Sequence, residues 1–207
     1  MVAYYPFNGN ANDESGHANN GVVNGATLTT DRHGNADKAY SFDGINDRIS
    51  GNVDGSLFSV HKTISLWAVI SGAGNFNPRL VGIGPAGSSA QYYSLVIEGT
   101  ASPRRIQFYT QGGVADGYST TLISNGNLWR NYIVTYEGSI VKIYIDGILD
   151  KATSTSGILA NFSTAVLQIG SSDNGFDWFN GKLDDLRIYD RALSDVEVQT
   201  LYNAEKP

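Results

Sequence analysis

The chain has 207 residues, no cysteine and a formal net charge of −6. The missing cysteines exclude a disulfide framework, a zinc–thiolate cluster and a thiol nucleophile. The acidic balance, without any Lys/Arg run, argues against a nucleic-acid partner. No apolar stretch is long enough to insert into a membrane, and no signal peptide is visible, so we expect any export signal to lie outside this chain. Length and composition predict a single large β domain over residues 1–207.

Short alternating runs follow one another along most of the chain. They are rich in Ile, Val, Tyr, Thr and Trp and are separated by Gly, Asn, Asp and Ser clusters, which is typical of a β-sandwich. Within Ile64–Ile70 the even positions are aliphatic, which marks the face toward the core. The predicted strands are 62–70, 79–84, 91–97, 105–110, 118–124, 129–137, 140–146, 166–170 and 181–189.

Polar and aromatic side chains share one face of several predicted strands. Arg105, Gln107 and Tyr109 lie opposite Ile106 and Phe108 by alternation. Further candidates for the same polar face are Arg79 and Tyr92. If these faces line a concave sheet, they form a groove suited to an oligosaccharide, and the arginines would suit an acidic one. The alternative is that the tyrosines are ordinary strand residues with solvated hydroxyls.

The loop 171–180 carries three aromatic residues among polar ones. Exposing a tryptophan to water is costly, so Trp178 is either packed against the last strand or used to bind a ligand. Both interpretations remain open from the sequence.

An acidic pair, Asp184 and Asp185, lies inside the last predicted strand. Period-two alternation puts Asp184 on the core face with Leu186 and Ile188, unless the strand is bulged, and puts Asp185 on the opposite face. Burying an unpaired carboxylate is expensive. Asp184 therefore needs a cation, a metal ion or several backbone N–H groups.

One short helix is predicted over residues 194–203. Ser194 can act as the N-cap, and Glu197 three residues later completes a capping box. Val198 and Leu201 then form a short apolar stripe.

Enzymatic chemistry finds little support in the sequence. Retaining glycoside hydrolases need two carboxylates about 5–5.5 Å apart, and the few glutamates are scattered over turns and the helix. No Gly-x-Ser-x-Gly elbow accompanies the three histidines. Tyr109 or Tyr144 could serve a polysaccharide lyase, but we predict a noncatalytic protein.

Several segments in order resemble bacterial laminin G-like (concanavalin A-like) domains. They are Ala3–Gly16, Ala39–Ile49, Ile64–Trp67, Ile143–Gly147 and Leu183–Leu201, and the resemblance covers nearly the whole chain. It implies an all-β jelly-roll sandwich of two curved antiparallel sheets with one short C-terminal helix. It also implies a secreted or cell-surface accessory module, monomeric within a larger chain.

The resemblance further implies one structural calcium ion. In the family, the N-terminal loop and the acidic pair before the last strand come together, and calcium takes six to eight oxygen ligands. The implied ligands are Asp13, Asn20, Asp184 and Asp185. The alternative is that Asp13 caps a turn, while Asp184 is satisfied by backbone N–H groups or by Arg187 or Arg191.

Two classes of function follow. The first is a noncatalytic carbohydrate-binding module that targets a secreted polysaccharide-degrading enzyme or a surface protein to a polysaccharide. The second is a protein-interaction, adhesion or spacer module of a surface protein. A glycoside hydrolase or polysaccharide lyase is the less favoured third reading.

Overall fold

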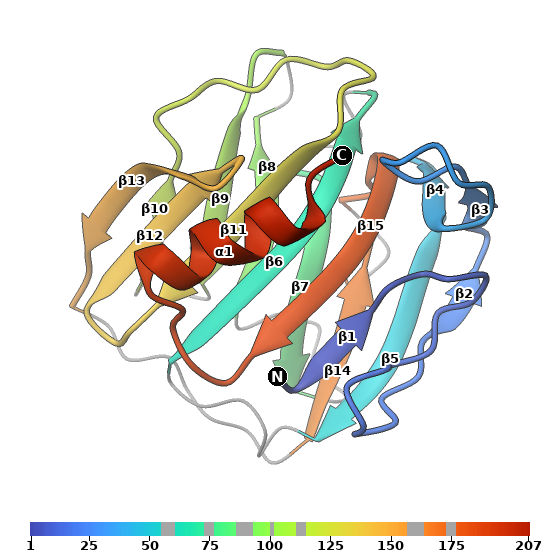
Figure 1. Ribbon diagram of the computed structural model, residues 1–207, viewed down its shortest axis with the longest axis horizontal. Helices are drawn as coiled ribbons and strands as arrows, with labels where there is room; N and C mark the ends of the chain where they lie inside the picture. Colours follow the sequence, from blue (N-terminus) through green and yellow to red (C-terminus); the bar gives the residue numbers. More distant parts are fainter. Residues whose placement is uncertain are drawn as a thin grey trace.

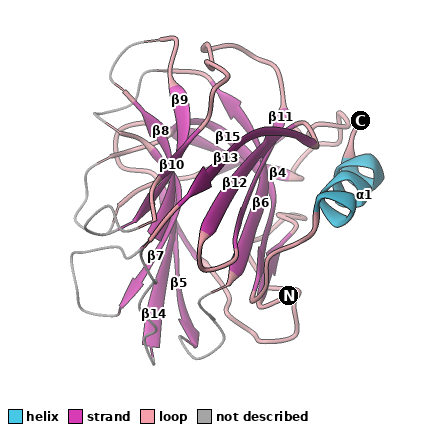
Figure 2. Ribbon diagram, turned by 90° about the vertical axis from the view of Figure 1, so that its left-hand side faces the viewer, coloured by secondary structure: helices cyan, strands magenta, loops and turns pink. Residues whose placement is uncertain are grey.

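A computed structural model describes residues 1–54, 61–72, 77–85, 93–99, 102–110, 115–156, 164–172 and 177–207. Two antiparallel sheets lie face to face, and one helix packs outside them (Figures 1 and 2). The predicted all-β jelly roll with a single short C-terminal helix is confirmed.

The first sheet has eight strands in the order β13-β12-β11-β6-β15-β4-β3, with β1 beside β15. Its strands are β1 (Ala3–Tyr5), β3 (Thr27–Thr29), β4 (Ala39–Asp43), β6 (Lys62–Ile70), β11 (Arg130–Tyr136), β12 (Ile140–Ile145), β13 (Ile148–Ser154) and β15 (Asn180–Tyr189). The hairpin between β12 and β13 turns at Asp146 and Gly147, which both have positive φ, as a two-residue type I′ turn requires.

The second sheet has seven strands in the order β10-β9-β8-β7-β14-β5-β2. Its strands are β2 (Val22–Asn24), β5 (Arg48–Asp54), β7 (Arg79–Pro85), β8 (Tyr93–Glu98), β9 (Arg105–Thr110), β10 (Gly117–Tyr118) and β14 (Thr164–Ile169). Long alternating runs fall where the sequence predicts strands, and β6 and β9 have the predicted bounds. The predicted strand 118–124 shrinks to β10 and an isolated bridge from Arg104 to Ile123.

The hydrophobic core fills the space between the sheets. Ile64 and Leu66 of β6 face Leu95 and Ile97 of β8 across it as parts of one buried cluster, and Phe108 of β9 joins them. Each such side chain, removed from water, contributes roughly 1.5–3 kcal/mol. Residues that alternate with these core positions therefore define the outer face of each sheet.

The helix α1 (Asp195–Glu205) crosses the outer face of the eight-stranded sheet, over β12, β11 and β6 (Figure 1). The predicted capping box between Ser194 and Glu197 is present. Val198 packs with Ile133 and Tyr144 of the sheet in a second apolar cluster. The helix thus covers one outer face, whereas the described residues place no helix on the outer face of the seven-stranded sheet (Figure 2). The helix is too short and polar to cross a membrane.

Candidate functional site

The acidic pair lies on the outer face of the eight-stranded sheet, not in the core. Asp185 has φ 48°, and the register against β6 shifts between Asp184 and Arg187, which marks a β-bulge. The extra residue lets Leu183 and Leu186 both enter the core, while Asp184 pairs with Trp67 on the outer face. The bulge is thus the exception under which Asp184 leaves the core face. The prediction that Asp185 lies on the face opposite to Asp184 is wrong, because only an unbroken period of two separates neighbouring side chains in that way.

Arg32, which lies between β3 and β4, binds both carboxylates. Its Nη1 donates to Asp184 Oδ2, and its Nη2 donates to Asp185 Oδ2 at 2.6 Å. The guanidinium also lies 5.0 Å from the centre of the Trp67 ring, and its Nε donates to the Glu205 carbonyl oxygen at 2.7 Å. The cation that the acidic pair requires is thus Arg32, which is 152 residues away from Asp184 in the chain.

Two further charged groups complete this network. Arg187 Nη2 lies 3.3 Å from Asp185 Oδ1, and Arg187 Nη1 pairs with Glu205. We refer to Arg32, Asp184, Asp185, Arg187 and Glu205 as the Arg32 cluster. Two guanidinium groups face three carboxylates, which leaves a formal charge of −1 in a largely buried position. Burial raises the pKa of Asp184 to about 7; the charge of Arg32 opposes this shift and that of Asp185 adds to it.

Asp13 caps its own loop. Its Oδ1 accepts hydrogen bonds from the backbone N–H groups of Tyr4 and Ser15, both at 2.9 Å, and its Oδ2 accepts one from Asn19 at 3.0 Å. Burial alone would raise the pKa of Asp13, but these hydrogen bonds outweigh it and hold the pKa below its usual value. Asn20 is also engaged within the loop, because its Oδ1 accepts from the Asp13 N–H at 3.0 Å.

The four predicted calcium ligands do not converge on one point. Tyr4 separates the two acidic sites, because its backbone N–H binds Asp13 while its hydroxyl, at the far end of the side chain, donates to Asp185 at 2.9 Å. Across the described ranges, His, Asp and Glu side chains form no group of three or more that could hold a metal ion. The predicted ligand set, Asp13, Asn20, Asp184 and Asp185, is therefore not assembled in this structure, and Arg32 is the cation that meets Asp184 and Asp185.

We therefore expect chelation to leave the stability of the fold unchanged. An ion that binds only the native state would add to its stability, and its removal would lower the melting temperature by several degrees. Thermal melts in EDTA and in millimolar calcium chloride should coincide within about 1 °C, well inside the shift that a bound ion produces. A lower melting temperature in EDTA that calcium restores would contradict this expectation.

Predicted polar residues do gather on the outer face of the seven-stranded sheet. Arg79 Nη1 donates to Ser94 Oγ at 2.6 Å, its Nε lies 3.3 Å from Asp177 Oδ2, and its guanidinium carbon is 5.2 Å from the centre of the Tyr109 ring. Gln107 Nε2 donates to the Tyr118 hydroxyl oxygen at 3.0 Å. Arg79, Gln107 and Tyr109 are thus fixed by their neighbours in one polar and aromatic group.

The other predicted ligand residues are not part of this polar and aromatic group. Arg105 is exposed where β9 begins. Tyr92 lies outside the described residues. Trp178 is only 8% exposed, beside the fully buried Phe179, so its ring is not presented for stacking on a sugar. Of the two interpretations of Trp178, packing is the one that describes its position.

Small and polar side chains continue across this face as one row. Cross-strand pairing joins six residues on six neighbouring strands, in the order Tyr109, Ser94, Gly82, Gln168, Ser50 and Val22. Gly82 has no side chain and the serines are small, so the side chains in the middle of the row are shorter than those at its ends. Ser94, Gly82 and Gln168 are buried. We refer to this row as the trough. Five spacings of roughly 4.8 Å make it about 24 Å long. The sequence did not reveal the trough, because its residues come from strands far apart in the chain.

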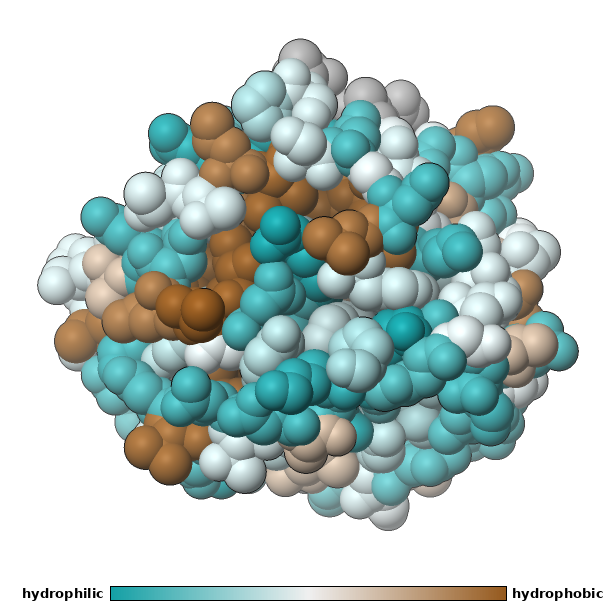
Figure 3. Space-filling view, turned by 45° about the horizontal axis from the view of Figure 1, so that its top comes forward, coloured by the Kyte–Doolittle hydropathy of each residue, from teal (hydrophilic) through white to brown (hydrophobic). Residues whose placement is uncertain are grey.

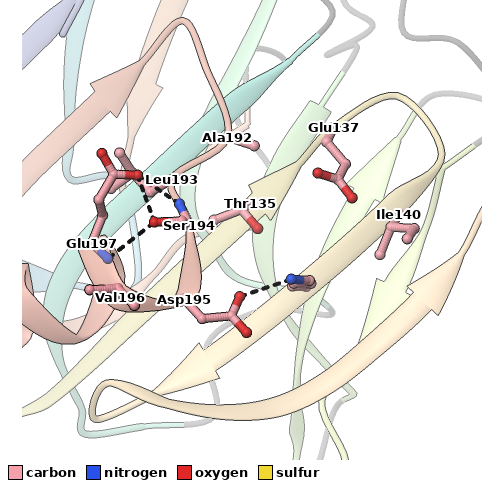
Figure 4. Close-up of a pocket in the computed structure, with 10 residues that line it drawn as sticks. Thr135, Glu137, Ile140, Ala192, Leu193, Ser194, Asp195, Val196 and Glu197 are labelled. Carbon is pink, nitrogen blue, oxygen red and sulfur yellow. Dashed lines mark hydrogen bonds and ion pairs between the residues drawn. The ribbon is translucent and has the colours of Figure 1, made fainter.

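A second hollow, of about 470 Å³, lies where the beginning of α1 meets β11 and β12 (Figure 4). Lys142 Nζ and the Tyr144 hydroxyl both donate to Asp195 Oδ1, at 2.8 and 2.7 Å. Glu197 is held by the capping box with Ser194. These groups already bind one another, which favours a role in anchoring the helix rather than in binding a ligand.

A family model described as the concanavalin A-like lectin/glucanases superfamily, of laminin G type, matches residues 42–199. The chain belongs to this superfamily. Among solved structures, domain 4 of the extracellular GH43 arabinanase AbnA from Geobacillus stearothermophilus, in complex with arabinotriose, has a TM-score of 0.74 at 20% identity, with 97% of each chain covered. The binding domain of botulinum neurotoxin serotype D has a TM-score of 0.70 at 16% identity, over 99% of this chain and 51% of the toxin domain.

Two sequence relatives of this laminin G-like chain are animal proteins. Human usherin is 27% identical over 82 residues, which is 37% of this chain. The adhesion G-protein coupled receptor V1 of Danio rerio is 27% identical over 125 residues, or 56% of this chain. The matched segments make up only 2% of the length of either relative. These likenesses, like those to the solved structures, concern the fold of one module.

Proposed function

We propose that this laminin G-like chain is a noncatalytic carbohydrate-binding module. The observation that carries the proposal is the group of Arg79, Gln107 and Tyr109 at one end of the trough, on an outer sheet face where the described residues form no helix. Support also comes from the arabinanase domain, a module of the same fold in complex with arabinotriose.

The geometry at this end of the trough suits sugar recognition. A sugar ring combines an apolar face with hydroxyl groups, so it needs an aromatic surface and fixed hydrogen-bonding groups side by side. Tyr109 supplies the first, and the exposed Tyr118 hydroxyl, which the buried Gln107 holds in place, supplies the second. Arg79 is held by Asp177 and Ser94, so less side-chain entropy is lost on binding than for a free arginine.

The proposal includes a targeting role outside the cell. A module without catalytic groups of its own would hold a polysaccharide-degrading enzyme, or a surface protein, on a polysaccharide. The acidic pair supports the noncatalytic part, since Arg32 binds both carboxylates at once and Asp185 also accepts a hydrogen bond from the Tyr4 hydroxyl. Neither acid is placed to act on a substrate at the sheet face.

Replacing Tyr109 with alanine tests the site. We expect a glycan that binds the wild-type chain on an array to bind Tyr109→Ala about tenfold more weakly, because the loss of an aromatic contact of about 1.5 kcal/mol is a factor of ten. Tyr109→Phe keeps the ring and serves as the matched control, with affinity close to wild type. Equal affinity of Tyr109→Ala for every bound glycan would place the site elsewhere.

An exposed apolar patch favours protein interaction as the second candidate function. Leu122, Leu128, Ile148 and Leu149 are between 43% and 69% exposed, and the hollows they line adjoin at Arg130. Figure 3 shows hydrophobic side chains gathered at this end of the molecule. Relatives that include an adhesion receptor agree with such a role. Failure to bind any glycan, together with a protein partner whose binding is lost in Leu128→Asp, would favour this candidate.

A further inference from the structure

The trough ends, at the edge opposite to Tyr109, in a hollow of about 520 Å³. The hollow lies over β2, β5 and β14, and its wall includes the loop that precedes β2. The residues that line it include Asn20, Asn24, Arg48, Ser50, Asn52 and Val166. Arg48, Ser50 and Asn52 alternate with the core residues Ile49 and Val53, so their side chains share the outer face of β5.

The lining of the hollow mixes apolar residues, Ala18, Val22 and Val166, with polar ones, and it carries a single positive charge. Three asparagine amides and the Ser50 hydroxyl can each donate and accept hydrogen bonds. Arg48 is the one charged residue among the lining residues, and no carboxylate is among them. Within the described part of the chain, Arg48 has no ion pair, in contrast to Arg79, Arg130, Arg187 and Arg191.

Several of these polar groups keep donors and acceptors for a ligand. Asn20 uses its Oδ1 to accept from the Asp13 N–H, which orients the amide and leaves its NH₂ group for another acceptor. Asn52 is exposed on β5. Ser50 donates to Gln168 Oε1 at 2.7 Å and can still accept a hydrogen bond. The arrangement offers hydrogen bonds to hydroxyl groups around one guanidinium.

The hollow lies on the same sheet face as the trough of the proposed function. Ser50 is a member of the cross-strand row, and Gln168 connects it to Gly82 in the middle of the sheet. Four strand spacings separate Ser50 from Tyr109, or roughly 19 Å. A chain of several sugars could therefore reach from the aromatic end to Arg48.

We propose that this hollow binds an acidic sugar residue, with the carboxylate on the Arg48 guanidinium and the ring hydroxyls on Asn20, Asn52 and Ser50. An arginine binds a carboxylate through two parallel hydrogen bonds, which fixes the orientation of the sugar. A lone guanidinium on a chain of net charge −6 suits one carboxylate among neutral sugars better than a densely charged polymer. This inference rests on the proposed function and names the acidic sugar as its substrate class.

The test follows the backbone and side-chain amide signals of the ¹⁵N-labelled protein by NMR during three titrations, with glucuronate, glucose and acetate. Glucuronate should shift the signals of Arg48, Asn20 and Asn52, and both glucose and acetate should shift them far less. Equal shifts with glucose would mean that the carboxylate is not recognised. Equal shifts with acetate would reduce the hollow to a simple anion site. Either result, or no shift with glucuronate, would overturn the proposal.

Three variants test whether Arg48 binds the carboxylate of glucuronate. Arg48→Gln should weaken glucuronate binding roughly ten- to a hundredfold, the range expected for loss of a charged hydrogen bond. Arg48→Lys keeps the charge without the planar fork and should fall between Arg48→Gln and wild type. Lys151→Gln removes the same charge from the exposed edge strand β13 and should bind as wild type does. Equal binding by Arg48→Gln and wild type would contradict the assignment, and melting curves show whether each variant is folded.

A glycan array separates this inference from the proposed function. If neutral oligosaccharides bind and the binding depends on Tyr109, but glucuronate does not shift the NMR signals of Arg48, the module binds carbohydrate and the proposed acidic subsite is wrong. If no glycan of any kind binds, both proposals fail together.

Discussion

Replacing Arg32 with methionine is expected to lower the free energy of unfolding by about 3–5 kcal/mol, the cost of leaving a buried charge without its partner. The side chains of Arg32 and Asp184 are 6% and 3% exposed, so water cannot take over the role of the guanidinium. The variant would also lose the contacts of Arg32 with the Trp67 ring and with the Glu205 carbonyl at the end of α1. Urea unfolding at neutral pH measures the effect.

Two controls separate the buried charge from other causes. The triple variant Arg32→Met, Asp184→Asn, Asp185→Asn removes the uncompensated charges and should regain most of the lost stability. Arg191→Met removes an arginine from a solvent-exposed ion pair with Glu197 and should shift the unfolding midpoint far less. Unchanged stability in Arg32→Met would mean that the Arg32 cluster does not hold the acidic pair.

The same substitution should leave glycan binding intact in the folded protein. The Arg32 cluster lies under the end of α1 on the eight-stranded sheet, whereas the trough lies on the outer face of the other sheet. Below its melting temperature, Arg32→Met is therefore expected to bind the same glycans as the wild type.

The free energy of unfolding should fall as the pH rises from about 4 to 7, through the ionisation of Asp184. In the unfolded chain this carboxyl loses its proton near pH 3.9, whereas burial raises its pKa to about 7 in the native state. Between these values the native state binds more protons than the unfolded state, so raising the pH favours unfolding. The loss from this group is at most about 4 kcal/mol.

The measurement compares wild type with Asp184→Asn in urea at pH values from 4.5 to 8. Other titrating groups contribute to both proteins, so the difference between the two curves isolates Asp184. That difference should change steadily up to pH 7 and level off above it. A constant difference over the whole range would show that Asp184 is ionised throughout.

The ionisation of Asp13 changes the free energy of unfolding in the opposite direction, and it does so below the pH range in which Asp184 acts. Its hydrogen bonds hold the pKa below the usual value, so the stability that it contributes is present above about pH 4 and is lost as the pH falls further. The two acids that the family resemblance groups together are thus distinguishable by the sign of their pH dependence.

Strand prediction succeeded where alternation is long and failed where strands are short. The bounds of β6 and β9 follow from apolar residues at every second position over six or more residues. The strands β1, β2 and β3 have three residues each, too few to show a period, and β2 is largely exposed. Pairing with a longer neighbour forms these strands, and local sequence does not reveal such a partner.

The sequence predicted the residues of one candidate site and missed the central residue of the other. Arg79, Gln107 and Tyr109 were found because alternation puts them on one face, although the contact between Arg79 and Tyr109 needed the pairing of β7, β8 and β9. Arg48 was missed because nothing near it in the chain distinguishes it. Its neighbours Asn20 and Asn24 come from another strand and its loop, and they meet Arg48 only across the sheet.

By itself the sequence determined the all-β class, the capped helix and the need of the acidic pair for a partner. Each of these follows from local patterns or from the cost of burying a charge. Only the tertiary structure decided which cation meets that need. A single residue in a left-handed conformation at Asp185 turns both carboxylates to the side where Arg32 arrives from the far end of the chain. Such a bulge shifts the register without a clear mark in the alternating pattern, so only the assembled sheets could show it.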